Sequence, residues 1–174
     1  SRIKTIRKNI DRMFVILPFE KDFYNSHGMD VDFVGHPLLD AIDNYLKKKN
    51  NDSVAEQKII AILPGSRKQE INNMLPLMLK TSVNFPDEQF VVAATSSVDK
   101  SIYNIVFNYK NVKIKYNCTY EILADAKAAL VTSGTATLET ALFKVPEVVC
   151  YKGSLLSYHI AKYFIKVKYI SLVN

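Results

Sequence analysis

Short runs of β-branched and other apolar residues alternate with helical patterns along most of the chain. The strand-like runs are MFVIL, VDFV, KIIAIL, QFVVAA, VKIK, KAALV, EVVCY and YISL, at residues 13–17, 31–34, 58–63, 89–94, 112–115, 127–131, 147–151 and 169–172. Apolar residues at helical spacing fill the intervals 37–49, 67–84, 98–108, 119–125, 135–144 and 154–166. This regular alternation predicts right-handed βαβ units, and hence a parallel sheet with helices on both faces.

The last six strand-like runs suffice for a doubly wound, Rossmann-like α/β domain over residues 58–174, which we expect to be truncated at its C-terminal end. In such sheets, ligands bind beyond the carboxyl ends of the strands, near the point where the strand order reverses. Residues 1–35 hold only two strands, too few for a sheet with a core of its own. We therefore expect them to be the tail of a truncated N-terminal Rossmann-like domain, with residues 36–57 as an interdomain linker and helix.

The composition is that of a globular protein, with 48% hydrophobic and 23% charged residues among 174. No apolar run reaches the roughly 18 residues of a membrane-spanning helix, and the charged N-terminal stretch lacks the apolar segment of a signal peptide. Cys118 and Cys150 fit neither a metal-ligand spacing nor a disulfide framework, which indicates a reducing cytosol.

The net charge of +6 is concentrated at the C-terminal end of the chain. Residues 151–174 contain four lysines and no acid, and therefore supply +4 of it, interleaved with Tyr158, Tyr163, Phe164 and Tyr169. This pattern fits a helix that packs its aromatic residues inward and leaves its lysines in solvent. It also fits a surface that meets an anionic phospholipid or nucleic acid. Because no RNA- or DNA-reading motif is present, we expect no nucleic-acid partner.

The motif ILPGSRKQEI, residues 62–71, has the form of a strand, a turn and a helix start. Ser66 is expected to begin the helix, with Gln69 three residues later completing a capping box, and neither feature needs a ligand. Arg67, however, stands in the first helical turn, where the helix dipole disfavours a cation. An anion such as a phosphate, placed between Arg67 and the free backbone N–H groups, would make this position favourable.

The motif LVTSGTATLETALFKVP, residues 130–146, contains a second helix start. Ser133 or Thr135 can cap this helix, and Gly134 allows a close approach to the backbone, so the free N–H groups of the first turn form an anion site. Glu139 follows Thr135 by four residues, on the same face and about 6 Å further along the helix. It could accept hydrogen bonds from the ribose of a nucleotide whose diphosphate lies at the helix start, or it could simply stabilise the helix dipole. The buried stripe is expected to be Leu138, Ala141, Leu142 and Val145.

The two helix starts follow the first and fourth strands of the predicted sheet. In the strand order 3-2-1-4-5-6 these strands are neighbours, so both helix ends can face one diphosphate. Neither loop is a Walker A or a G-x-G-x-x-G motif, which argues against a mononucleotide hydrolase and a dinucleotide dehydrogenase.

Six motifs together resemble the lipid A disaccharide synthases, in order, from about residue 11 to the end. They are LPFEKDFY, VGHPLLD, LPGSRKQEI, TSGTATLETAL, VVCYK and AKYFIKVKYISLVN. The resemblance implies the two-domain GT-B architecture, with this chain as its C-terminal part. It also implies an inverting glycosyltransferase of the bacterial cytoplasm, peripheral on the inner membrane, without a metal or other cofactor. It is compatible with a homodimer at full length. The implied reaction transfers 2,3-diacylglucosamine from UDP-2,3-diacylglucosamine to 2,3-diacylglucosamine 1-phosphate and yields the β-1,6 disaccharide of lipid A and UDP.

The resemblance also implies roles for single residues. Ser66 and Arg67 would meet the diphosphate, Glu139 would bind the ribose, and the diphosphate would be cradled by Ser133, Gly134, Thr135, Ala136 and Thr137. Asn174 falls on the asparagine of the family's Ser-Leu-Pro-Asn motif, here with Val173 in place of proline, and is the candidate catalytic residue of this chain. The catalytic carboxylate is expected in the N-terminal half, outside it. His36 marks the junction, as a linker residue or on the acceptor side.

We therefore expect this chain to bind the UDP part of the donor and to turn over nothing by itself. One alternative is a UDP-sugar epimerase of the same fold, which would use the same diphosphate and ribose contacts, although LPFE and SLVN argue against it. Another is a basic membrane-surface adaptor that uses the lysines between residues 152 and 168.

Overall fold

The computed structural model describes residues 2–49 and 58–152. The chain divides into two compact units, Ser1–Asn51 and Asp52–Asn174. The predicted strand at 169–172, the predicted helix at 154–166, the lysine- and aromatic-rich segment within it and Asn174 lie outside the described residues.

The first unit contains three helices and two very short strands among its described residues. These are α1 (Arg2–Asn9), β1 (Phe14–Val15), α2 (Pro18–Ser26), β2 (Asp32–Phe33) and α3 (Pro37–Lys49). The strands pair in parallel, and Val15, Met29 and Val31 form a small buried cluster beside them. The assignment of residues 1–35 to the end of a larger domain stays a prediction.

The LPFE motif forms the start of α2. Pro18 occupies the first helical position, where its missing N–H leaves no hydrogen bond unmade. The Glu20 carboxylate turns back and accepts hydrogen bonds from the backbone N–H groups of Ile16, at 3.2 Å, and Leu17, at 2.9 Å. The motif therefore has a structural role as a helix cap within this unit.

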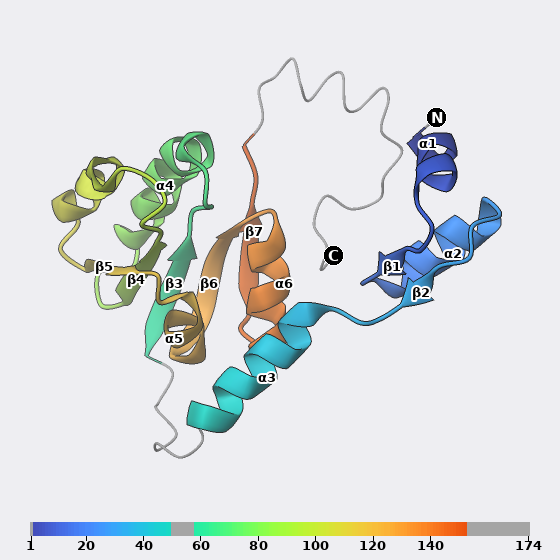
Figure 1. The fold of residues 1–174 in the computed structure, drawn as a ribbon. Helices are drawn as coiled ribbons and strands as arrows, with labels where there is room; N and C mark the ends of the chain where they lie inside the picture. The colour runs from blue at the N-terminus through green and yellow to red at the C-terminus, as the bar shows by residue number, and fades with distance from the viewer. Residues whose placement is uncertain (1, 50–57, 153–174) are drawn as a thin grey trace. The chain divides into compact units, whose positions relative to one another are not determined.

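The described part of the second unit, residues 58–152, forms a five-stranded parallel sheet with intervening helices (Figure 1). Its elements are β3 (Ile59–Leu63), α4 (Lys68–Ser82), β4 (Gln89–Ala94), the 3₁₀ helix η1 (Lys100–Asn108), β5 (Val112–Tyr116), α5 (Thr119–Ala124), β6 (Ala126–Thr132), α6 (Thr135–Leu142) and β7 (Glu147–Cys150). The strand order is β5-β4-β3-β6-β7. Numbered within this unit, that order is 3-2-1-4-5, as predicted for the first five strands, with the reversal between β3 and β6.

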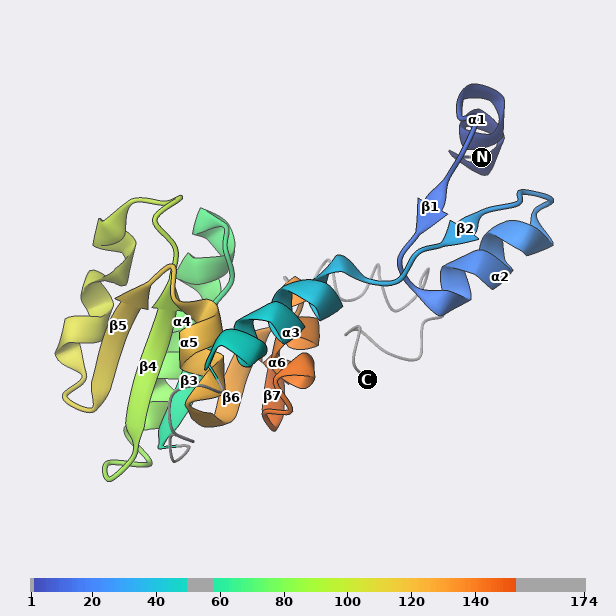
Figure 2. The ribbon, with the colours of Figure 1, turned by 60° about the horizontal axis from the view of Figure 1, so that its bottom comes forward.

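Helices cover both faces of this sheet, which confirms the doubly wound class. Figures 1 and 2 show α5 and α6 on one face, and α4 with η1 on the other. The main core lies under α4 and η1, where Phe90 and Val92 of the sheet pack with Leu75, Leu79 and Tyr103, all of them buried. Among the described residues, no helix is both long and apolar enough to cross a membrane.

The start of α4 differs from the prediction by one residue. Arg67, not Ser66, precedes the first helical residue. The side chain that completes the capping box is that of Glu70, not that of Gln69. Glu70 accepts hydrogen bonds from the backbone N–H groups of Ser66, at 3.2 Å, and Arg67, at 3.3 Å. An ionised carboxylate is a stronger acceptor than an amide for these groups, which explains why Glu70 takes the position.

The buried face of α6 is also different from the predicted stripe. Thr137 and Thr140 are fully buried and Ala141 is exposed, whereas Leu138 and Leu142 are only partly buried. The threonine hydroxyls donate to backbone carbonyls within the helix, from Thr137 to Gly134 at 2.7 Å and from Thr140 to Ala136 at 2.7 Å. Because these hydroxyls are satisfied locally, their burial leaves no polar group unpaired.

Candidate functional site

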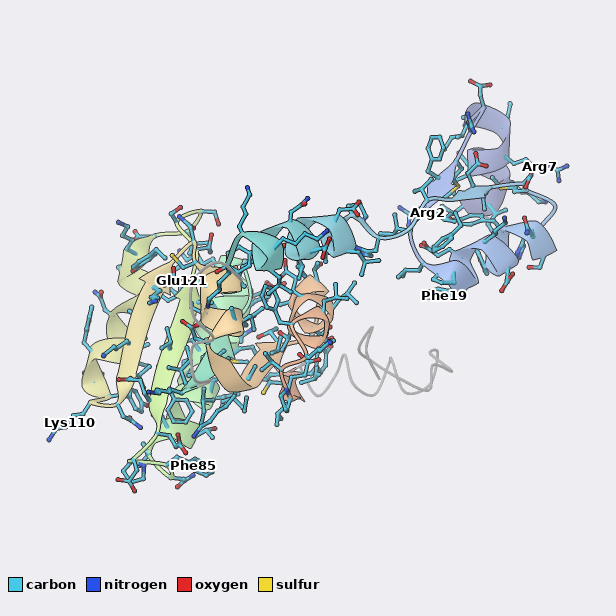
Figure 3. The ribbon with its side chains drawn as sticks, turned by 90° about the horizontal axis from the view of Figure 1, so that it is seen from below. Arg2, Arg7, Phe19, Phe85, Lys110 and Glu121 are labelled. Carbon is cyan, nitrogen blue, oxygen red and sulfur yellow. The ribbon has the colours of Figure 1, made fainter. Side chains whose placement is uncertain are left out.

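A cavity of about 440 Å³ lies at the carboxyl edge of the sheet of the second unit. Its walls come from the segments that follow four neighbouring strands, β3, β4, β5 and β6. Figure 3 shows Glu121, at the start of α5, at this end of the sheet, and Phe85 and Lys110 at the opposite end. The cavity therefore occupies the place where open α/β sheets bind ligands.

The α4 side of the cavity is formed by Gly65, Ser66, Arg67 and Glu70. The Arg67 guanidinium donates to the Glu70 carboxylate at 2.8 Å, and its side chain remains 81% exposed. Burial raises the pKa of Glu70, but the hydrogen bonds from Arg67 and Ser66 outweigh it and lower the pKa below its usual value. In this structure Arg67 pairs with a carboxylate of its own helix, and its predicted contact with a phosphate stays a prediction.

The α6 side of the cavity is formed by small residues around the start of this helix. Gly134, which has no side chain to form a cap, precedes the first helical residue, Thr135, and the capping role predicted for Ser133 stays a prediction. Among the described residues, none accepts a hydrogen bond from the backbone N–H groups of Thr135 or Ala136, which are left over at any helix start. A Cβ added at Gly134 would meet nothing within 4 Å, and Gly134, Thr135 and Ala136 all line the cavity.

Glu139 lines the same cavity one helical turn further along α6. Its side chain is partly buried, and burial raises the pKa of its carboxyl group. No described residue donates a hydrogen bond to this carboxylate. A partly buried carboxylate without donors can accept hydrogen bonds from a ligand at little rearrangement of the protein.

The remaining wall is formed by the ends of β4 and β5, with Thr95, Asn117 and Thr119 facing the cavity. Thr132, at the end of β6, also lines the cavity, and its hydroxyl is buried without a hydrogen-bond partner among the described residues. Groups that could move protons are few here, since Glu70 is held by a cap and Glu139 is the other carboxylate of the lining. The described residues contain no group of three or more His, Cys, Asp or Glu side chains placed to hold a metal ion.

Most of the predicted site residues are brought together. Seven of them line the cavity: Ser66, Arg67, Ser133, Gly134, Thr135, Ala136 and Glu139. Thr137 does not line the cavity, because it is fully buried and its hydroxyl donates to the Gly134 carbonyl. His36 belongs to the first unit, where its Nδ1 accepts the Leu38 N–H at 3.2 Å, so the ring caps the start of α3.

Sequence reasoning missed the polar residues at the ends of β4 and β5 and the capping role of Glu70. Thr95 and Asn117 could have been found by the rule that was applied to the other two loops, because each directly follows a strand of the sheet. Glu70 could have been found as the carboxylate nearest to the turn.

Comparison with known proteins adds a decisive observation to this geometry. The family model for lipid-A-disaccharide synthetase matches residues 1–174. The chain belongs to this family. A lipid-A-disaccharide synthase of Syntrophus aciditrophicus is 40% identical over 185 residues, covering 100% of the chain and 48% of the relative. Lipid-A-disaccharide synthase 1 of Legionella pneumophila (strain Paris) is 37% identical over 184 residues, with the same coverage.

The chain thus spans about half the length of the curated relatives it matches. Among solved structures, it is similar to the UDP-GlcNAc 2-epimerase of Neisseria meningitidis bound to UDP-GlcNAc, with a TM-score of 0.61 and 17% identity. The similarity covers 87% of this chain and 47% of the epimerase. At this identity it shows a common GT-B-like fold, whereas the family match carries the functional relationship.

Proposed function

We propose that this chain is the nucleotide-sugar-binding half of a lipid A disaccharide synthase. The full-length enzyme would transfer 2,3-diacylglucosamine, with inversion, from UDP-2,3-diacylglucosamine to 2,3-diacylglucosamine 1-phosphate, forming the β-1,6 disaccharide and UDP. The observation that carries the proposal is the Glu139 carboxylate without a donor among the described residues, which lines the same cavity as Thr135 and Ala136, whose backbone N–H groups have no acceptor among the described residues. A carboxylate and an anion site one helical turn apart fit the ribose and the diphosphate of one nucleotide.

In the proposed complex, the diphosphate lies against the start of α6. The N–H groups of Thr135 and Ala136 donate to its oxygens, and the absence of a side chain at Gly134 lets the phosphate approach the backbone. Arg67 exchanges Glu70 for the diphosphate, to which its planar guanidinium can donate two hydrogen bonds. Ser66 and Ser133 complete the cradle.

Ribose binding follows from the position of Glu139. The two sugar hydroxyls are donors that a carboxylate accepts as a pair, and the low exposure of this group strengthens both hydrogen bonds. Since burial raises the pKa of Glu139, this part of the affinity should decrease when the pH falls through that pKa and the carboxyl group becomes neutral.

We assign the acceptor site and the catalytic carboxylate to the part of the relatives' length that this chain does not span. By this proposal residues 1–35 end the N-terminal domain, residues 36–57 link it to the second unit, and Asn174 contributes from the donor side. The full-length protein would work at the surface of the inner membrane, where its acylated substrates lie. The chain alone should turn over nothing, and transferase activity by the chain alone would contradict this assignment.

The test is a calorimetric titration of the chain with UDP and with 2′,3′-dideoxy-UDP. Glu139→Gln should weaken UDP binding about ten- to a hundredfold, because hydrogen bonds to a charged acceptor contribute about 1.5–3 kcal/mol. Its effect on the dideoxy analogue should be small, because that ligand lacks both hydroxyls. Glu121→Gln is the matched control, since Glu121 lies at the same end of the sheet in an ion pair with Lys115 and outside the cavity lining.

Two results would overturn the proposal. One is a Glu139→Gln variant that binds UDP as tightly as the unchanged chain does. The other is an equal loss for UDP and for the dideoxy analogue, which would mean that the carboxylate does not meet the ribose.

A further inference from the structure

Tyr120 packs against the face of α6 that bears Glu139. Its ring lies 5.4 Å from the ring of Phe143, with 51° between the ring planes. Phe143 follows Glu139 by four residues at the end of α6, and its N–H donates to the Glu139 carbonyl at 3.1 Å. Because side chains four residues apart share one face of a helix, this contact brings Tyr120 to the side of α6 on which Glu139 stands.

The helix that carries Tyr120 runs beside the cavity. Figures 1 and 2 show α5 and α6 on the same face of the sheet. Thr119, the first residue of α5, lines the cavity together with Glu139, whereas Tyr120 is partly buried beside this lining rather than in it. Tyr120 can therefore act on a ligand only through a neighbouring residue.

The electrostatics of the two side chains agree with this packing. Burial raises the pKa of Tyr120, and the negative charge of Glu139 raises it further. Burial also raises the pKa of Glu139, and no described residue donates a hydrogen bond to its carboxylate. The phenol is thus close enough to respond to the charge of the carboxylate, and what it provides to Glu139 is an apolar ring rather than a hydrogen bond.

Two ion pairs hold charged side chains near Glu139. Arg67 and Glu70, which line the same cavity, pair with each other at 2.8 Å. Glu121, on α5, pairs with Lys115. Burial, rather than a charge partner, is then what distinguishes Glu139 from an ordinary surface carboxylate.

We propose that Tyr120 is a positioning residue of the proposed ribose site, whose ring shields the Glu139 carboxylate from water and holds it toward the cavity. This inference rests on the proposed UDP site. A carboxylate screened from solvent makes stronger hydrogen bonds to the two ribose hydroxyls, because water competes less for it and the local dielectric constant is lower. The side-chain entropy lost on binding is also smaller when the carboxylate is already held in place.

The test is a double-mutant cycle, measured by calorimetric titration of the chain with UDP and with 2′,3′-dideoxy-UDP. We expect Tyr120→Ala to weaken UDP binding about three- to tenfold, and binding of the dideoxy analogue by less than about twofold. Tyr120→Phe, which keeps the ring, should bind UDP within about twofold of the unchanged chain. In a Glu139→Gln background, Tyr120→Ala should change UDP affinity by less than about twofold, because the carboxylate on which the ring acts is absent.

A second readout needs no ligand. The pKa of the Glu139 carboxyl group, followed by NMR titration, should fall toward its usual value in Tyr120→Ala, because water then reaches the carboxylate, and should stay raised in Tyr120→Phe. Phe143→Leu, which removes the ring that supports Tyr120, should show the same changes as Tyr120→Ala to a smaller extent. It serves if Tyr120→Ala fails to fold.

Tyr109→Ala is the matched control. Tyr109 is also a partly buried tyrosine, but it packs against the main core under α4 and η1, on the other face of the sheet. Its neighbour Lys110 lies at the end of the sheet away from the cavity (Figure 3). This variant should reduce stability and leave the ratio of UDP affinity to dideoxy-UDP affinity unchanged.

An equal loss for UDP and the dideoxy analogue in Tyr120→Ala, or a loss that persists in the Glu139→Gln background, would overturn the role of Tyr120. A Tyr120→Phe variant that binds UDP as weakly as Tyr120→Ala would overturn the role of the ring. If Glu139→Gln weakens UDP binding and Tyr120→Ala does not, only this inference fails. If the unchanged chain does not bind UDP, the proposed function itself fails.

Discussion

The crowded turn before α4 yields a stability prediction that can be worked out from distances. Gly65 has φ 104°, and a Cβ built on it would lie 2.7 Å from Oε2 of Glu70 and 2.9 Å from its Cβ. The same Oε2 accepts the N–H groups of Ser66 and Arg67. An alanine at position 65 would therefore be strained by its backbone and would also displace the carboxylate that caps α4.

Two contributions set the size of the effect of Gly65→Ala. A residue with a Cβ in a left-handed conformation costs about 1–2 kcal/mol. Displacing the Glu70 carboxylate removes a helix cap that stabilises the fold by about 1 kcal/mol, and any remaining contact with its Cβ adds to the loss. We expect the free energy of unfolding to fall by about 3 kcal/mol, which lowers the melting temperature by roughly 10 to 15 °C for a unit of this size.

The assay is urea unfolding followed by circular dichroism, with Gly35→Ala as the matched control. Gly35 also has a left-handed backbone, at φ 79°, but a Cβ there meets nothing within 4 Å. That variant carries the backbone strain alone and should lose about 1–2 kcal/mol. A loss from Gly65→Ala no greater than that from Gly35→Ala would refute the reasoning, because the Glu70 contribution would then be absent.

Two further predictions concern partly buried carboxyl groups. Burial raises the pKa of Glu139 above 4.5, so its contribution to stability is complete below pH 4.5 and is lost as the pH rises through the raised pKa. Urea unfolding across pH 4 to 8 should show this slope in the unchanged chain and a flatter profile in Glu139→Gln; equal slopes would contradict the assignment. Burial also raises the pKa of Glu147, although the Thr140 hydroxyl opposes the shift, and neither Glu147 oxygen has a hydrogen-bond partner among the described residues. Glu147→Met should therefore stabilise the fold by about 1 kcal/mol at pH 8 and by less at pH 5, with UDP affinity unchanged; a less stable variant at pH 8 would show that this carboxylate is paired.

The sheet of the second unit could be predicted because its strands carry a strong and simple signal. Buried parallel strands are continuous apolar runs, and the handedness of βαβ units then restricts the order of the strands. The element over residues 98–108 was harder, since a helical pattern does not distinguish an α-helix from a 3₁₀ helix. Tyr103 and Val106, three residues apart, are its buried positions, which is the spacing of a 3₁₀ helix.

Side chains that bond to their own backbone explain where the prediction of α6 was wrong. Hydropathy predicts that threonine lies on the exposed face of a helix and leucine on the buried face. Thr137 and Thr140 are nevertheless fully buried, because each hydroxyl finds a carbonyl of the preceding turn. Such local satisfaction depends on rotamers, and a sequence pattern carries no information about them.

The candidate site shows the same division between backbone and side-chain information. The residues of the two helix starts could be found because their position depends only on topology and on the free N–H groups of helix ends. The wall around Asn117 was not predicted, because it depends on a side-chain hydrogen bond from Asn117 to Ser96, 21 positions earlier in the chain. No local sequence motif predicts a contact between residues so far apart in the chain.

The two helix starts at the cavity are unlike each other, and the difference indicates how an anion would be held. At α4, the Glu70 carboxylate already accepts the N–H groups of Ser66 and Arg67, so this helix end is neutralised from within. What α4 can offer is the Arg67 guanidinium, whose exposed pair with Glu70 contributes little stability and is therefore readily exchanged for a diphosphate. At α6, the N–H groups of Thr135 and Ala136 have no acceptor among the described residues and offer fixed backbone donors instead. The charged segment PGSRKQE and the small, uncharged segment SGTAT thus differ because one supplies a side-chain charge and the other supplies the backbone.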